Sequence, residues 1–202
     1  MSWIESVLYE AAEGRLKRTY DRVKGPDNYI DNILMVHGLR PHTLDGHMAL
    51  YKSVLHHTDN ALPKWLLETL GVYVSMLNGC EYCVAHHSQG LRRLLEDESR
   101  ADAVIATLRN QEFPDGLFSE RERLALLYAR DLTLSPMDVS HSLILRLRKA
   151  GLADGEILEI NQVVSYFAYA NRTVLGLGVT TEGDRLGLSP SGVSSAQDWK
   201  HR

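Results

Sequence analysis

The apolar residues of this chain recur at the spacing of an α-helix over most of its length. The valine clusters, such as Val72 and Val74, lie inside helical patterns, and no segment reads as a convincing strand. We therefore predict an all-α fold. The expected helices cover residues 2–24, 28–37, a stretch that begins at Pro41, and then 61–77, 80–95, 99–109, 119–132, 135–150 and 153–176.

Polar residues and glycine mark several of the expected helix ends. Asn60 is expected to cap the fourth helix, because a short polar side chain can accept from the first free N–H groups. The Asn78-Gly79 pair is expected to end the same helix. Ser119 and Glu122 have the spacing of a capping box and predict the start of the seventh helix.

Length and composition indicate one globular domain over residues 1–202, since 44% of the residues are hydrophobic, enough to build a core. Within it we expect N-terminal helices in residues 1–58 and a core that carries the site in residues 61–178. Residues 180–202 are rich in glycine, serine and charge. We expect this tail to be extended, or ordered only against a neighbour.

Charge and hydropathy limit the partners. The formal net charge is −4, which argues against nucleic acid as the main partner. Glu5, Glu10 and Glu13 interrupt the region where a signal peptide needs an apolar stretch. The longest apolar runs, such as residues 70–77, are far shorter than the ~20 residues of a spanning helix. We expect a soluble, cytoplasmic protein that binds neither nucleic acid nor membrane.

The chain has two cysteines, and they lie three residues apart as Cys80 and Cys83. The Asn-Gly break places Cys80 near a helix N-terminus, where the helix dipole and free N–H groups favour a thiolate. Cys80, Cys83 and His87 follow at i, i+3 and i+7 and share one helix face. His87 can accept the proton of Cys83 directly or through a water molecule. This pattern predicts a dithiol redox site.

Other interpretations of the pair are weaker. Buried core cysteines are common, but here both lie beside two histidines. A structural zinc needs four ligands, and the remaining histidines are scattered, so no second ligand cluster is evident and we predict no metal. A thioredoxin-type site needs a strand before the cysteines, and the sequence offers none.

The segment from Glu68 to His87, with eleven residues before Cys80-Glu-Tyr-Cys83-Val-Ala-His-His87, resembles the core motif of the AhpD-like alkylhydroperoxidases. These belong to the carboxymuconolactone decarboxylase superfamily, and the likeness is greatest to its peroxidase-related branch. The resemblance implies an AhpD-like multi-helix domain. Weaker matches are Leu39-Arg40-Pro41, Asn171-Arg172, Gly176-Leu-Gly178, Glu182-Gly-Asp184 and Gly187-Leu-Ser-Pro190.

The resemblance implies a role for each matching residue. Cys83 corresponds to the peroxidatic cysteine and Cys80 to the resolving cysteine. His87 corresponds to the histidine that relays a proton to and from Cys83, and Glu68 to the glutamate that supports it. Without the resemblance, Glu68 would read as a solvated helical residue four positions after a lysine.

Two further residues are possible auxiliaries. Tyr82 stands where the best-known members carry a histidine, and tyrosine does not titrate near neutral pH. We expect its ring to pack and its hydroxyl to be anchored. His86 is an additional histidine, and the resemblance does not fix its role.

The expected function is a thiol-dependent peroxidase that reduces hydrogen peroxide or organic hydroperoxides through a dithiol/disulfide cycle. The resemblance implies no bound cofactor, an external lipoyl or thioredoxin-like reductant, and a homo-oligomer (dimer, trimer or hexamer) with the N-terminal helices as a candidate interface. One alternative is a decarboxylase of the carboxymuconolactone type, which does not require the cysteine pair. Another is a non-enzymatic thiol redox sensor.

Overall fold

The computed structural model describes residues 2–187, and in this part of the chain it contains helices and no β-strand. The single β-type contact there is an isolated bridge between Asp115 and Phe118. The all-α prediction is confirmed. The α-helices are α1 (Gly14–Val23), α2 (Asn32–Met35), α3 (Pro41–Leu55), α4 (Lys64–Leu77), α5 (Glu81–Leu95), α6 (Glu98–Asn110), α7 (Glu120–Leu134), α8 (His141–Lys149) and α9 (Asp154–Leu177). The 3-10 helices are η1 (Tyr9–Ala11), η2 (Pro26–Asn28) and η3 (Pro136–Asp138).

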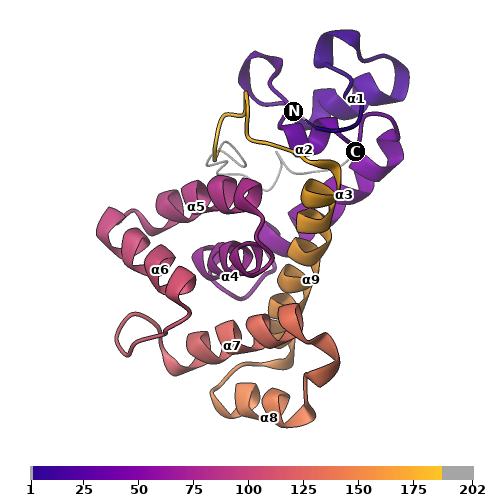
Figure 1. The fold of residues 1–202 in the computed structure, drawn as a ribbon. Helices are drawn as coiled ribbons and strands as arrows, with labels where there is room; N and C mark the ends of the chain where they lie inside the picture. Colours follow the sequence, from indigo (N-terminus) through magenta and orange to yellow (C-terminus); the bar gives the residue numbers. More distant parts are fainter. Residues whose placement is uncertain (1, 188–202) are drawn as a thin grey trace.

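Helix α4 lies at the centre of the fold (Figure 1). It packs against α5, α6, α7 and α9, and every residue from 66 to 75 is buried. A helix that is hydrophobic on all sides has to be enclosed by other elements. The composition of α4 therefore explains why the other helices surround it, and it holds Glu68 in the interior.

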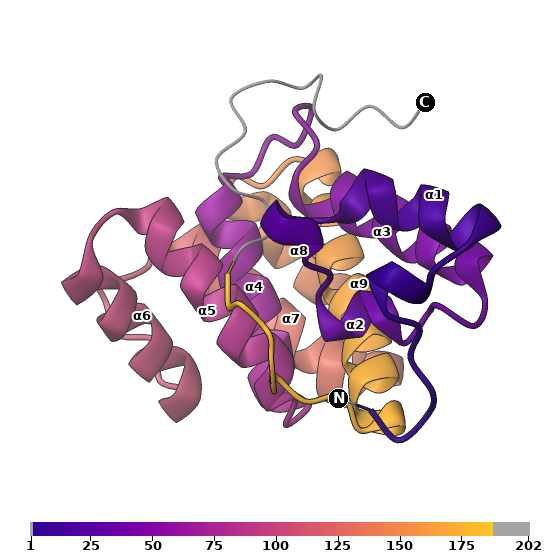
Figure 2. The ribbon, with the colours of Figure 1, turned by 90° about the horizontal axis from the view of Figure 1, so that it is seen from above.

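The N-terminal helices cover one side of α9. Helix α1 packs on α3, and α3 packs on α4 and α9 (Figure 2). After α9, residues 178–187 run back over α5 without forming a helix or a strand. This return path brings the C-terminal part of the chain close to the cysteine motif.

Two expectations for the N-terminal region are wrong. Residues 2–8 are not helical, because the backbone N–H of Trp3 donates to the carbonyl of Leu177 (2.8 Å) and joins this segment to the end of α9. The helix expected over residues 28–37 is reduced to α2, since Asp27 and Asn28 adopt positive φ angles that do not continue a helix.

Asn60 does not cap α4. The helix begins after Pro63, and the side-chain amide of Asn60 donates instead to the carbonyl of Val54 near the end of α3 (3.1 Å). The N–H groups of Ala61 and Leu62 donate to the carboxylate of Glu159 (2.8 and 2.9 Å). A partner far away in the sequence thus binds the two residues at which the helix was expected to begin.

Other boundaries agree with the sequence. Ser119 precedes α7, and its N–H donates to the Glu122 carboxylate (2.7 Å), as the capping box predicts. The expected helix from residue 135 begins late, because η3 precedes α8. Of the expected tail, residues 188–202 lie outside the described residues. None of the described helices is both long and apolar enough to cross a membrane.

Candidate active site

The junction of α4 and α5 positions the two cysteines. Helix α4 ends at Asn78-Gly79, and Gly79 has φ +67°, a left-handed conformation that glycine adopts without strain. The chain then turns so that the N–H of Cys80 donates to the carbonyl of Ser75 (2.8 Å). Cys80 is the N-cap residue of α5, and Cys83 lies in its first turn. Both cysteines are free and buried.

The two thiols differ in acidity. The hydrogen bond from the Cys83 thiol outweighs burial and, with the backbone N–H of Cys83, lowers the pKa of Cys80 to about 7. The same thiol hydrogen bond, burial and the negative charge on Cys80 raise the pKa of Cys83 well above its usual value. The reduced pair therefore holds its negative charge on Cys80, while Cys83 keeps a proton.

A cavity of about 260 Å³ meets the cysteine pair on one side. Of the two cysteines, Cys83 lines the cavity wall. Cys80 does not line it and is fully buried. The wall further includes Glu68, His86 and His87. The apolar and aromatic side chains around it include Ile33, Leu34, Met48, Tyr51, Tyr82 and Tyr166, and the charged residues Arg22, Lys24, Asp31 and Lys52 also line it.

Glu68 and His87 form a close pair at this cavity. Nδ1 of His87 lies 2.7 Å from Oε2 of Glu68, and the Glu68 side chain is only 4% exposed. The ring of Phe167 packs edge-on against the imidazole, with 4.7 Å between the ring centroids. Since the carboxylate occupies Nδ1 and the ring packs on Phe167, the orientation of His87 is fixed and Nε2 is left for proton exchange.

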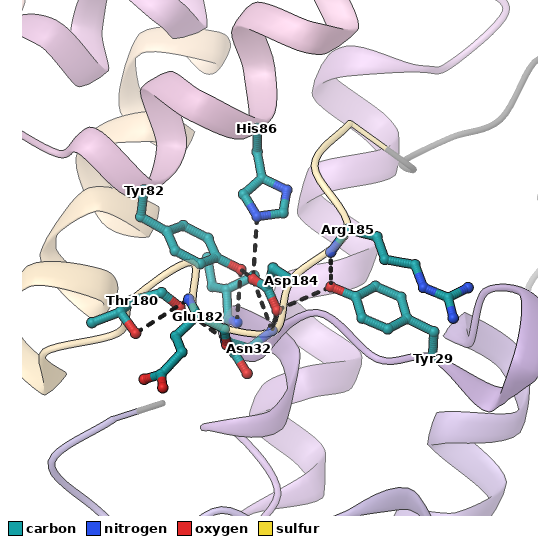
Figure 3. Close-up of polar contacts among 9 residues, drawn as sticks. Tyr29, Asn32, Tyr82, His86, Thr180, Glu182, Asp184 and Arg185 are labelled. Atoms are coloured by element: carbon teal, nitrogen blue, oxygen red, sulfur yellow. Dashed lines mark hydrogen bonds and ion pairs between the residues drawn. The ribbon is translucent and has the colours of Figure 1, made fainter.

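Tyr82 and His86 lie together around Asp184, which belongs to the resemblance through Glu182-Gly-Asp184 but for which the sequence predicted no role (Figure 3). The Tyr82 hydroxyl donates to Oδ2 of Asp184 (2.6 Å) and accepts from the N–H of Ile33 (3.2 Å). Nε2 of His86 lies 3.2 Å from the same Oδ2. Tyr82 thus anchors the segment after α9 to α5, and its ring stacks on His86 with centroids 4.6 Å apart.

Asp184 accepts hydrogen bonds from two parts of the chain, residues 29–32 and helix α5. Besides Tyr82 and His86, the Tyr29 hydroxyl (3.0 Å) and the backbone N–H of Asn32 (3.1 Å) donate to Oδ1. Burial alone would raise the pKa of Asp184, but the hydrogen bonds from His86, Tyr82 and Tyr29 outweigh it and hold the pKa below its usual value. Asp184 is therefore a carboxylate anion with nearly saturated acceptors.

Asp31 lies next to this carboxylate. Burial, with a contribution from the charge of Asp184, raises the pKa of Asp31. Asp31, His86 and Asp184 each offer a ligand atom within 4.8 Å of the others, so a divalent cation is sterically conceivable. Because hydrogen bonds already occupy both oxygens of Asp184, we interpret the group as a hydrogen-bonded cluster. Among the described residues, the cysteines belong to no such group.

Asn171 is a second residue whose role the sequence did not reveal. It is fully buried on α9, its amide donates to Ser75 Oγ (3.1 Å), and its oxygen accepts from the Asn78 amide (2.9 Å). Its side chain also favours the thiolate forms of Cys80 and Cys83. The Asn171-Arg172 dipeptide belongs to the resemblance, but nothing in its spacing indicated contact with the cysteines.

Comparison with known proteins finds a family match over part of the chain and a shared fold. Residues 41–131, which contain α3 to α5 and the cysteine motif, match the carboxymuconolactone decarboxylase family. The structure is similar to that of a peroxidase-related protein from Ralstonia eutropha JMP134, described as an alkylhydroperoxidase AhpD core (TM-score 0.76, 22% identity, 89% of this chain and 91% of that chain). The chain therefore carries a match to the carboxymuconolactone decarboxylase family over residues 41–131 and has an AhpD-like fold.

Other AhpD-like structures share the fold. A peroxidase-related protein from Silicibacter sp. TM1040 has a TM-score of 0.74 at 19% identity, over 89% of this chain and 91% of that chain. The debrominase Bmp8 in complex with 2,3,4-tribromopyrrole has a TM-score of 0.70 at 17% identity, over 89% and 93%. The AhpD-like fold therefore hosts more than one activity. No curated protein matches the sequence.

Proposed function

We propose that this AhpD-like protein is a thiol-dependent peroxidase that reduces hydrogen peroxide or organic hydroperoxides with its two cysteines. One observation carries the proposal: Cys83 lines a cavity that the fixed His87–Glu68 pair also lines, while Cys80 lies directly behind it with a lowered pKa. A nucleophile, a base and a resolving thiolate are thus arranged around one space.

The first step is attack of Cys83 on the peroxide. Because Cys83 holds its proton in the reduced pair, the proton has to leave, and Nε2 of His87 is the acceptor in the cavity wall. The thiolate then attacks the terminal oxygen and breaks the O–O bond. This gives the sulfenic acid of Cys83 and an alcohol or water.

The second step closes the disulfide. The thiolate of Cys80 attacks the sulfur of the sulfenic acid, and the hydroxyl leaves as water after it takes a proton. The lowered pKa of Cys80 favours this step, since about half of the Cys80 side chains are ionised near pH 7. A dithiol then reduces the disulfide by exchange and returns both cysteines to the thiol state.

The cycle uses sulfur chemistry alone, so the proposal includes no bound cofactor or metal. The proposed reductant is an external dithiol, such as a lipoyl or thioredoxin-like protein. The proposed assembly is a homo-oligomer in which α1 and α3 contribute the interface. The apolar and aromatic part of the cavity wall supports organic hydroperoxides as substrates alongside hydrogen peroxide.

Stopped-flow oxidation of the reduced protein by hydrogen peroxide, tert-butyl hydroperoxide and cumene hydroperoxide tests the proposal. A steady-state assay with dihydrolipoamide follows turnover. A peroxidase oxidises rapidly and consumes peroxide continuously, whereas a redox sensor oxidises once and stops. A decarboxylase reacts with none of the peroxides, and that result would overturn the proposal.

Variants of the acid–base pair sharpen the assay. His87→Asn should slow peroxide reduction by about 10²–10⁴-fold, the usual contribution of positioned acid–base catalysis. Glu68→Gln should act in the same direction and less strongly, because it leaves the imidazole in place. His57→Asn is the matched control, since the His57 side chain is exposed and does not line the cavity. Equal rates for all three variants would contradict the assigned roles.

A further inference from the structure

Cys83 lies next to two histidines on α5, although the proposed cycle has so far used only one. His86 and His87 follow Cys83 at i+3 and i+4, the two positions that are neighbours on a helix surface. Both imidazoles and Cys83 line the same cavity. The reacting sulfur is therefore close to two ring systems that can exchange protons.

Each histidine is held by a carboxylate from a different part of the chain. Glu68 of α4 accepts from Nδ1 of His87. Asp184 of the segment after α9 lies at Nε2 of His86, as Figure 3 shows. The carboxylates are nearly inaccessible, with side chains 4% and 1% exposed. Because opposite ring nitrogens are occupied, Nε2 of His87 and Nδ1 of His86 are the atoms left for a molecule in the cavity.

The surroundings of the two rings differ. Four titratable groups surround His86. They are Tyr29 and Asp31, which both precede α2, Tyr82 of α5, and Asp184. Asp31 and Asp184 each have a carboxyl oxygen within 4.8 Å of a ring nitrogen of His86. His87 has the carboxylate of Glu68 at Nδ1, and its charge also interacts with Cys80, His56 and Asp31.

We propose that His86, positioned by Asp184, is a second catalytic histidine that donates a proton to the oxygen that leaves the peroxide. The inference rests on the proposed peroxidase function. His87 takes the proton of Cys83, the sulfur forms a bond to the terminal oxygen, and the O–O bond breaks. The leaving alkoxide takes a proton from the His86 imidazolium and departs as the alcohol. Proton transfer from His87 to His86 through water restores both rings, so the net reaction is thiol plus hydroperoxide to sulfenic acid plus alcohol.

Peroxides with different leaving groups test this role. The tert-butoxide formed from tert-butyl hydroperoxide is a strong base and leaves poorly without a proton, whereas the acetate formed from peracetic acid leaves readily. His86→Asn should slow the oxidation of Cys83 by tert-butyl hydroperoxide by about 10²-fold or more and leave the peracetic acid reaction nearly unchanged. His87→Asn should slow both reactions, because both need the thiolate.

Matched variants and a chelator complete the experiment. Asp184→Asn should show the same selectivity as His86→Asn with a smaller loss, and His57→Asn should change neither rate. An equal loss with both oxidants, or no loss with either, would overturn the role of His86. Loss of wild-type activity after treatment with EDTA would overturn it in favour of a cation held by Asp31, His86 and Asp184. Failure of the wild type to react with any peroxide would instead overturn the proposed function.

Discussion

Replacement of Gly71 by alanine tests how closely α4 and α9 approach behind the site. A Cβ at this position would lie 2.2 Å from Cε2 and Cζ of Phe167, far inside the ~3.5–4.0 Å of an ordinary carbon contact. Phe167 is fully buried, and its ring packs on Tyr166 and His87. The ring therefore has no free space into which it can rotate.

Two effects of opposite sign determine how Gly71→Ala changes the free energy of unfolding. Alanine in place of a mid-helix glycine stabilises a helix by about 1 kcal/mol. Insertion of a methyl group into a closely packed core costs about 1–3 kcal/mol. Because two ring atoms of Phe167 lie at 2.2 Å, we expect the upper end of that range and a net loss of about 1–2 kcal/mol in the free energy of unfolding. Peroxide reduction should also slow, since the displaced ring contacts His87.

Urea denaturation at about 25 °C measures the net change in the free energy of unfolding. Gly46→Ala is the matched control, because Gly46 lies in α3, is exposed, and has no neighbouring atom within 4 Å of the place that a Cβ would take; this variant should gain stability. Phe167→Leu should recover part of the loss in the Gly71→Ala background. A Gly71→Ala protein that is as stable as the wild type would refute the close contact of α4 and α9.

The remaining predictions concern the site. Mild peroxide should reduce the free thiols from two to none without intermolecular dimers, as measured by thiol titration. An ultraviolet titration of the reduced protein should show a thiolate with a pKa of about 7 that is absent from Cys80→Ser. Asp184→Asn should destabilise the protein at pH 7. Because folding lowers the pKa of Asp184, the difference should shrink as the pH falls below 3.8 and through the folded value, as measured by urea denaturation.

The sequence predicted the parts of the site that lie close together along the chain. The Asn78-Gly79 break and the spacing of the cysteines and His87 are local features, and local backbone geometry alone brings them to one face of α5. Glu68 required the family resemblance. Its burial follows from the central place of α4, which a single amphipathic pattern does not reveal.

The residues that the sequence missed come from distant segments. Asp184 is 98 positions from His86 in the sequence. Its contacts are polar, so no apolar pattern in the tail could predict that this segment packs on α5. Asn171 of α9 donates to Ser75 of α4 and lies beside both cysteines. The cap expected at Asn60 is absent for a similar reason, because Glu159 of α9 binds the backbone of Ala61 and Leu62 before the helix begins. Tertiary contacts determined each of these outcomes.

The most direct test of the account is to identify which cysteine a peroxide attacks. Each single serine variant, Cys80→Ser and Cys83→Ser, is treated with one equivalent of hydrogen peroxide and a dimedone-type reagent, and the intact mass is measured. The account predicts that Cys80→Ser consumes the peroxide and is trapped as a sulfenic acid adduct, while Cys83→Ser does not react. An adduct in Cys83→Ser and none in Cys80→Ser would show that the thiolate with the lower pKa, and not the one that faces the cavity, is the nucleophile.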